Sequence, residues 1–191
     1  ASSEELGRRL AINPEQIRKD LAFFGQFGKK GVGYYVAELK ESIGGILGLD
    51  NHWNVAIIGM GHLGAALANY QGIARLGFRL AAIFDANPVV IGTRVGERRV
   101  EDIAYLAEII AERDIQIGVI AVPAAHAQGV ADQLVAAGIR GIWNFAPVKL
   151  QVPPSIPFVS EDLSVGLSAL SYYLTHVSAE DGELSDKNLT D

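Results

Sequence analysis

Three glycines give the chain its clearest chemical signal. Gly59, Gly61 and Gly64 are spaced as G-x-G-x-x-G between an apolar run and a helix-like segment. At such a junction the first glycine permits a tight turn, the second lets the backbone approach a pyrophosphate, and the third lets the helix pack on the strand. The N-terminus of the helix stabilises the anion. The residues predicted to bind a dinucleotide here are Gly59, Met60, Gly61, His62, Leu63 and Gly64.

Asp85 ends the next apolar run, 21 residues after Gly64. A carboxylate at that place can accept hydrogen bonds from both ribose hydroxyls of an adenosine and would repel a 2′-phosphate, which favours NAD over NADP. Arg94, Arg98 and Arg99 follow, and one of them reaching that ribose would weaken the preference. The order of strand, glycines, helix, strand and acid is much more specific than the glycines by themselves.

Two further segments follow predicted strands, at the end where ligands of doubly wound sheets bind. Val122 and Pro123 form the first, and they are equally consistent with an ordinary turn. The second contains Asn144, Phe145 and Pro147. An amide and an aromatic ring just outside a strand could hold a nicotinamide.

The elements that must position these residues follow from the alternation of apolar runs and helix-like segments. Predicted strands cover residues 55–58, 80–84, 117–122, 141–145 and 158–159, and predicted helices cover 63–76, 100–111 and 127–137. Alternating helices and buried-looking strands are typical of α/β proteins with a parallel sheet. We therefore expect a Rossmann-type doubly wound domain over residues 52–160.

Residues 1–48 are expected to form a separate module of the winged-helix type. Ser2 and Glu5 form a capping box, and Asn13 and Gln16 form a second one after a three-residue break. Two short helices joined by such a turn are typical of helix-turn-helix proteins. A glycine-rich hairpin follows them, and its tip suits a phosphate backbone.

The second helix is expected to bury Ile17, Leu21 and Phe24, which recur at i, i+4 and i+7. Its exposed side and the hairpin carry the residues predicted to contact DNA, which are Gln16, Arg18, Lys19, Phe23, Lys29 and Lys30. Exposed Phe23 requires a partner, either a thymine methyl or another subunit. Any helix pair with a charged face and a lysine hairpin shows this pattern, so spacing alone leaves DNA binding open.

Composition limits the classes of function. The net charge of the 191 residues is −6, yet residues 1–40 hold seven Lys/Arg and five Asp/Glu, so a locally basic front precedes an acidic body. The absence of cysteine excludes thiol catalysis, disulfides and Cys-based zinc sites. No apolar stretch is long enough for a membrane span and the start is not signal-like, so a cytoplasmic protein is expected. Because the chain begins at Ala1 with a helix start, we expect an N-terminal piece to be missing.

Besides a DNA-binding protein that carries a dinucleotide, two other interpretations of the nucleotide site remain open. A small NAD-dependent oxidoreductase would need a substrate site and an acid-base group, which a second domain usually supplies. The remainder of the chain is short for such a domain, and the plausible base, His126, is more simply a polar loop residue. We therefore expect no enzyme. A CoA-binding or nucleotide-binding Rossmann module without DNA binding is the third interpretation.

The last helix is predicted over residues 161–177 and carries four leucines at i, i+4, i+7 and i+11, with further apolar residues on other faces. The leucines are Leu163, Leu167, Leu170 and Leu174. A helix that is apolar on more than one face must be covered twice, so we expect it to form a dimer. Packing on the chain's own sheet is the alternative. Residues 178–191 are acidic and are expected to be a disordered tail.

Together these segments resemble the Rex family of redox-sensing transcriptional repressors over nearly the full length. The residues that carry the resemblance are Gln16-Ile17-Arg18-Lys19-Asp20-Leu21, Phe24-Gly25, Gly31-Val32-Gly33-Tyr34, Gly59-Met60-Gly61-His62-Leu63-Gly64, Phe84-Asp85 and Asn144-Phe145-Ala146-Pro147. The resemblance implies a homodimer in which two winged helices bind a palindromic operator, each Rossmann domain binds NADH or NAD⁺, and the terminal helix swaps into the partner. It also implies that NADH releases the DNA and that NAD⁺ competes with NADH.

The resemblance further implies roles for particular residues. Arg18-Lys19 match the recognition helix of the family, and Lys29-Lys30 match its wing. Tyr70 matches a tyrosine near the nicotinamide, and Asp162 matches an acid at the head of the swapped helix. In the family these last two join an arginine of the first helix, which cannot be placed here. A chain without that helix could bind NADH and dimerise while binding DNA poorly.

Overall fold

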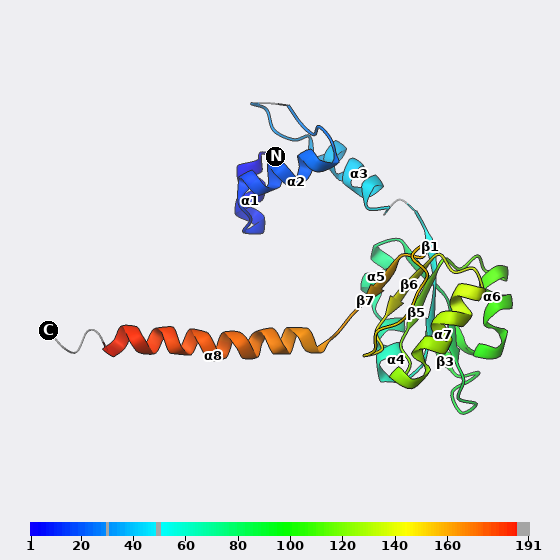
Figure 1. The fold of residues 1–191 in the computed structure, drawn as a ribbon. Helices are drawn as coiled ribbons and strands as arrows, with labels where there is room; N and C mark the ends of the chain where they lie inside the picture. Colours follow the sequence, from blue (N-terminus) through cyan, green and yellow to red (C-terminus); the bar gives the residue numbers. More distant parts are fainter. Residues whose placement is uncertain (30, 49–50, 187–191) are drawn as a thin grey trace. The chain divides into compact units, whose positions relative to one another are not determined.

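The computed structural model describes residues 1–29, 31–48 and 51–186. The chain divides into two compact units, each with its own packing (Figure 1). The first unit comprises Ala1–His52 together with Gly72–Phe78, and the second comprises Trp53–Gln71 together with Arg79–Asp191. Among the described helices, none is long and apolar enough to cross a lipid bilayer.

The first unit contains helices α1 (Ser3–Leu10), α2 (Pro14–Phe24) and α3 (Val36–Ile46). The two predicted helix starts are confirmed, since the Ser2 hydroxyl accepts the Glu5 N–H at 3.1 Å and the Asn13 side chain accepts the Glu15 N–H at 2.8 Å. The second capping box is wrong, because Gln16 donates to Asp20 one turn later instead of reaching back. Residues four apart face each other on a helix, so the Asp20 carboxylate lies within reach of the Gln16 side chain.

A tight hairpin lies between α2 and α3, where the sequence predicts one. Lys29 and Gly33 form a β-bridge, with N–H to oxygen distances of 2.9 and 3.0 Å between their backbones. Gly33 has a φ of +95°, and a Cβ there would come within 2.5 Å of the Ala1 carbonyl oxygen. The predicted buried stripe of α2 is wrong at Phe24, whose side chain is 55% exposed and meets the ring of Phe23 edge-on at 5.2 Å.

Seven strands of the described chain form one sheet in the order β3-β4-β2-β1-β5-β6-β7. The strands are β1 (Trp53–Ile58), β2 (Phe78–Asp85), β3 (Arg94–Val95), β4 (Arg98–Asp102), β5 (Ile117–Ile120), β6 (Gly141–Asn144) and β7 (Phe158–Ser160). Strand β3 runs antiparallel to β4, whereas β5 pairs in parallel with β1 and β6. The five predicted strands are confirmed, and the β3–β4 hairpin is an addition at one edge.

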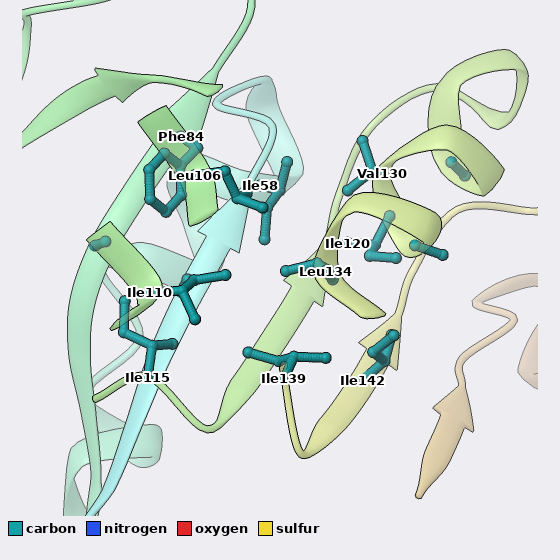
Figure 2. Packing of buried hydrophobic residues seen from close by; sticks show 14 of the residues in the cluster. Ile58, Phe84, Leu106, Ile110, Ile115, Ile120, Val130, Leu134, Ile139 and Ile142 are labelled. Atoms are coloured by element: carbon teal, nitrogen blue, oxygen red, sulfur yellow. The ribbon is translucent and has the colours of Figure 1, made fainter. Parts of the chain in front are cut away.

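Helices cover both faces of this sheet. Helices α6 (Leu106–Glu112) and α7 (Ala124–Ala136) lie on one face, and α4 (His62–Ala68) lies on the other (Figure 1). This placement follows from right-handed crossovers, because the chain leaves β1 toward one edge and leaves β5 toward the opposite edge. The main core packs the strands against α6 and α7 (Figure 2). Successive residues such as Ile57 and Ile58 are both buried, as expected of a sheet covered twice.

Three predicted helices differ most from the structure in their boundaries. The predicted helix over residues 100–111 begins only at Leu106, because Val100 pairs with Ile83 in the sheet. The predicted helix over residues 63–76 is two helices, α4 and the short α5 (Gln71–Arg75). The last helix, α8 (Ser164–Asp186), continues past residue 177, so the predicted tail is helical as far as Asp186. Residues 187–191 lie outside the described residues.

Candidate functional site

A cleft of about 730 Å³ lies at the carboxyl ends of β1, β2 and β5. Strands β1 and β5 are neighbours, and the chain leaves them toward opposite edges of the sheet, so this is the point where doubly wound sheets bind ligands. The residues that line the cleft are Ile58, Gly59, Gly61, Asp85, Ala86, Asn87, Ile103, Ala121, Val122, Pro123, Ala125, His126, Gly129, Val130 and Gln133. Five of the residues predicted from the sequence therefore meet in one place, namely Gly59, Gly61, Asp85, Val122 and Pro123.

The three glycines of the loop are under different constraints. Gly59 has a φ of +100°, and a Cβ there would come within 2.6 Å of the Ala121 carbonyl oxygen. A Cβ at Gly64 would collide with the carbonyl oxygen of Gly59. At Gly61 an added Cβ would have no neighbouring atom within 4 Å, and the φ of −72° is open to any residue. Close packing of neighbouring backbone therefore requires glycine at positions 59 and 64. At position 61 no neighbour requires it, and the backbone is open to the cleft.

Asp85 connects the glycine loop to the segment after β2. Its two carboxylate oxygens accept the Met60 N–H at 2.6 Å and the Asn87 N–H at 2.8 Å. Each carboxylate oxygen offers about two lone-pair positions. One position on each oxygen is therefore left for a hydroxyl of a ligand.

The arginines that follow Asp85 in the sequence are not next to it in the sheet. Asp85 is in register with Asp102 of β4, and Arg99 lies three residues earlier on that strand, about 10 Å away along it. Arg94 is paired with Arg99 on the neighbouring strand β3. The strand register thus separates these arginines from the acid, which leaves the preference for a free 2′-hydroxyl in place.

The side chain of Asn144 is buried and hydrogen-bonded within the protein, which contradicts the predicted direct contact with a nicotinamide. Its side chain is fully buried, and its NH₂ group lies 3.0 Å from both the Ala146 carbonyl oxygen and the Ser160 hydroxyl. Its side-chain oxygen accepts the Ala146 N–H at 3.0 Å. Both ends of the amide are therefore used to fix the turn after β6 against the end of β7.

Other predicted residues lie outside the lining of the cleft. Phe145 is half-buried and packs on the ring of Trp143 at 4.5 Å, and Tyr70 is 64% exposed. Asp162 caps α8, and hydrogen bonds from the Ser164 hydroxyl and N–H hold the pKa of its carboxyl below the usual value. The predicted residues that do not line the cleft are Met60, His62, Leu63, Gly64, Tyr70, Asn144, Phe145, Pro147 and Asp162.

Helix α7 contributes three residues to the cleft, and two of them, Gly129 and Gln133, were not predicted from the sequence. His126, Gly129 and Gln133 lie on one face of its first turns, as their spacing of three and four residues requires. That spacing directly after a predicted strand end was a signal that could have identified them. His126, the plausible base of the enzyme interpretation, is an exposed residue of the first turn of α7.

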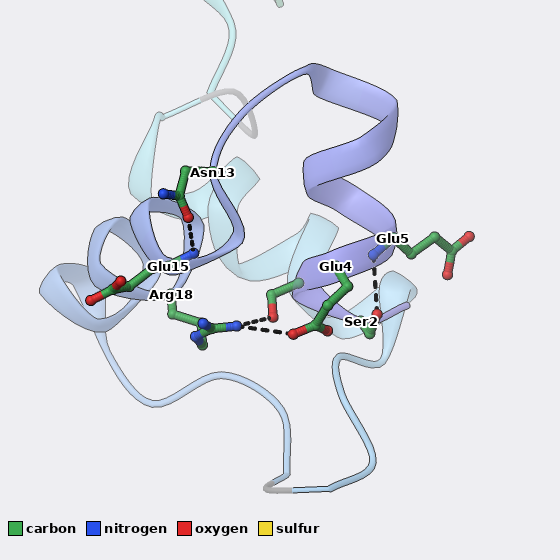
Figure 3. Close-up of polar contacts among 7 residues, drawn as sticks. Ser2, Glu4, Glu5, Asn13, Glu15 and Arg18 are labelled. Carbon is green, nitrogen blue, oxygen red and sulfur yellow. Dashed lines mark hydrogen bonds and ion pairs between the residues drawn. The ribbon is translucent and has the colours of Figure 1, made fainter.

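The predicted DNA-contacting residues occupy the exposed side of α2 and the hairpin. Phe23 is 85% exposed, and Lys19 pairs with Glu15 at 3.3 Å on the helix surface. Lys29 is exposed at the hairpin, whereas Lys30 lies outside the described residues. Arg18 is tied to the start of α1 through Ser3 and Glu4 (Figure 3).

The sheet, the glycine loop after β1 and the acid at the end of β2 define a Rossmann-type nucleotide-binding domain. The same chain also carries a pair of short helices followed by a hairpin, with basic and aromatic side chains exposed on the second helix. These two features together describe a nucleotide-binding protein with a helix-turn-helix unit.

Comparisons with known proteins identify the family. The model of the CoA binding domain matches residues 50–148. The redox-sensing transcriptional repressor Rex of Chloroflexus aurantiacus is 47% identical over 91% of this chain and 82% of its own length. A crystal structure of RSP in complex with β-NAD⁺ and operator DNA is 41% identical with a TM-score of 0.87, covering 100% of this chain and 87% of that one. RSP with β-NADH is 40% identical with a TM-score of 0.82, covering 98% and 85%. The chain carries a domain of the CoA-binding family and belongs as a whole to the Rex family of redox-sensing transcriptional repressors.

Proposed function

We propose that this protein represses transcription by binding operator DNA and that the NADH/NAD⁺ ratio controls its affinity for the operator. NADH bound in the cleft of the Rossmann domain releases the operator, and NAD⁺ competes with NADH for the cleft. One observation carries the proposal, namely the match along the whole chain to a structure that holds both β-NAD⁺ and operator DNA. Membership of a repressor family supports a regulatory ligand rather than a substrate.

We assign the parts of the dinucleotide to named groups in and beside the cleft. The pyrophosphate approaches the backbone at Gly61, where added atoms would enter open space. The hydroxyls of the adenosine ribose donate to the free lone pairs of Asp85, and Val122 and Pro123 bound the other side of the cleft. The remaining loop residues Met60, His62, Leu63 and Gly64 contribute backbone to the same loop. Phe145, at the end of β6, disfavours the charged ring of NAD⁺ by desolvation.

The DNA-binding surface consists of α2 and the hairpin. Gln16, Lys19 and Phe23 are exposed on α2, so they face the groove of the operator, and Phe23 contacts a thymine methyl. Lys29 of the hairpin contacts the phosphate backbone. These contacts combine base reading with sequence-independent phosphate binding.

Helix α8 supplies a dimer interface in this proposal. Leu163, directly before α8, is 66% exposed, and Leu167, Leu170 and Leu174 within α8 are 71, 58 and 72% exposed, which is unusual for leucines. A second copy of the chain covers them by exchanging α8, which brings Asp162 and Tyr70 toward the nicotinamide sites. Two-fold symmetry then presents two DNA-binding units to a palindromic operator.

Regulation requires that NADH bind two states of the dimer unequally. Linkage then makes operator DNA weaken NADH by the same factor by which NADH weakens the DNA. A coupling of roughly 2 to 3 kcal/mol, which is common for allostery, changes the operator affinity about thirty- to two-hundredfold. The interface formed by α8 is the element that switches between the two states.

The proposal is tested by measuring binding to the operator duplex of RSP by fluorescence anisotropy, first without nucleotide and then with increasing NADH. Release by NADH that excess NAD⁺ reverses is the expected result. Tight NADH binding with no effect on DNA would favour the nucleotide-binding module without DNA binding. Turnover of a hydroxy or carbonyl substrate that is lost in His126→Ala would favour the oxidoreductase.

A further inference from the structure

Arg18 of the proposed recognition helix is held at one end by the preceding helix. Its Nη1 donates to the Ser3 hydroxyl at 2.7 Å and to the Glu4 carboxylate at 3.1 Å (Figure 3). Both acceptors belong to the first turn of α1. Ser3 is buried, whereas the Arg18 side chain is 50% exposed. The guanidinium therefore has a fixed inner end and an open outer end.

The number of unused N–H donors shows which acceptors the outer end of the Arg18 guanidinium can bind. An arginine has five N–H donors, two of them on Nη1. Ser3 and Glu4 use both Nη1 donors, and within the described ranges nothing bonds to Nε or Nη2. The Nε and Nη2 donors of this edge are parallel, and they fit a pair of acceptors such as guanine O6 and N7 or two phosphate oxygens.

Glu4 keeps its charge although its side chain is 70% exposed. Hydrogen bonds from its own backbone N–H, from the Ser2 hydroxyl and from Ser3, together with the charge of Arg18, hold the pKa of the Glu4 carboxyl below its usual value. The carboxylate is therefore charged at neutral pH and sits at the favourable end of the α1 dipole. The anchor of Arg18 is thus stable across the pH range in which the protein would bind DNA.

Arg18 and the hairpin border the same cavity. A cavity of about 450 Å³ within the first unit is lined by Ser3, Glu4, Arg18 and Lys29, together with the glycines of the hairpin. Two positive side chains from different elements therefore border one hollow. One DNA segment could therefore meet both Lys29 and Arg18.

We infer that Ser3 and Glu4 are positioning residues for operator recognition, because they fix Nη1 of Arg18 and aim its Nε/Nη2 edge at a pair of acceptors on the DNA. This inference rests on the proposed function. In this role Glu4 strengthens DNA binding even though it carries a negative charge. A carboxylate that merely competed with DNA for Arg18 would have the opposite effect.

The test compares Glu4→Gln with Glu5→Gln in the full chain, using anisotropy with the operator duplex of RSP. Both variants lose one negative charge in the first turn of α1, but Glu5 pairs with Arg9 on the outer surface rather than with Arg18. The inference predicts that E4Q binds about tenfold more weakly than E5Q, the size of one charge-assisted contact. Equal affinity of the two variants, or tighter binding by E4Q, would overturn it.

Arg18→Lys provides a second arm that preserves the charge and removes the fork. We expect R18K to bind more weakly than the wild type. If R18K binds all DNA sequences more weakly by the same factor and its affinity depends less on salt, the acceptors are phosphate oxygens. If R18K loses affinity only for operators that carry one particular base pair, the acceptors belong to that base. Wild-type affinity in R18K would overturn the inference. Failure of the wild type to bind the operator at all would instead refute the proposed function.

Discussion

Replacing Gly61 with alanine adds one methyl group to the glycine loop at the place assigned to the pyrophosphate. The new Cβ would meet no atom of the described residues within 4 Å, and the backbone φ of −72° suits alanine. The free protein should therefore accept the substitution. The bound dinucleotide should not, because the methyl group occupies the space through which the phosphates approach the backbone.

The expected magnitudes separate these two effects. Glycine to alanine at a compatible position stabilises a protein by about 0.4–1 kcal/mol through the unfolded state. The poorer capping by alanine at this helix start offsets this gain by a similar amount, so the thermal midpoint should stay within a few degrees. Loss of one charge-assisted hydrogen bond to the pyrophosphate costs about 1.5–3 kcal/mol. The dissociation constant for NADH should therefore rise roughly 10- to 150-fold.

Isothermal titration calorimetry with NADH and thermal unfolding of the free protein measure both quantities. Gly64→Ala is the matched control, because its Cβ would collide with the carbonyl oxygen of Gly59. G64A should lose stability before any nucleotide is added, whereas G61A should lose affinity with its stability intact. An unchanged NADH affinity in G61A would refute the placement of the pyrophosphate at this loop.

Four further predictions concern the cofactor, the dimer and the helix cap. Asp85→Asn should narrow the preference for NADH over NADPH in calorimetric titrations, because the charge that repels a 2′-phosphate is removed. Phe145→Ala should narrow the affinity gap between NADH and NAD⁺, because the desolvation of the charged ring is relieved. Leu170→Asp should convert dimers to monomers in sedimentation experiments, because a charge enters the exposed leucine row. The helicity measured by circular dichroism should fall less at acid pH in Asp162→Asn than in the wild type. Its lowered pKa means that the wild-type carboxylate stabilises the fold above its usual value of 3.8 and loses this effect as the pH falls through the lower folded value.

Each of these predictions has a contrary outcome. An unchanged ratio of NADH to NADPH affinity would remove Asp85 from the ribose site, and an unchanged ratio of NADH to NAD⁺ affinity would remove Phe145 from the discrimination. A Leu170→Asp protein that sediments like the wild type would place the dimer interface elsewhere. Identical acid transitions in wild type and D162N would show that the cap does not stabilise α8.

The central part of the fold could be predicted because local and tertiary preferences agree there. The apolar run before Gly59 is a strand in the structure, as expected, and Asp85 ends the strand beside it. Their convergence follows from the rule that parallel strands end at one edge of the sheet. Residues 100–105 could not be predicted in this way, because their apolar spacing suits a helix and only pairing of Val100 with Ile83 places them in a strand and the turn after it.

Side-chain roles were less predictable than backbone positions. Asn144 looked like a ligand-binding amide because it follows a strand, but whether an amide is open or satisfied depends on neighbours distant in sequence, here Ser160. Phe24 has the spacing of a buried residue, yet it is 55% exposed and contacts the ring of Phe23. Gln133 of the cleft lies ten residues after Pro123, and its position depends on how α7 packs on the sheet.

The reciprocal coupling of NADH and operator DNA tests the central claim most directly. The dissociation constant for NADH would be measured with and without saturating operator duplex, and that for the operator with and without saturating NADH. The account predicts that both constants rise by the same factor, about thirty- to two-hundredfold. An NADH affinity that is the same with and without bound operator would contradict it.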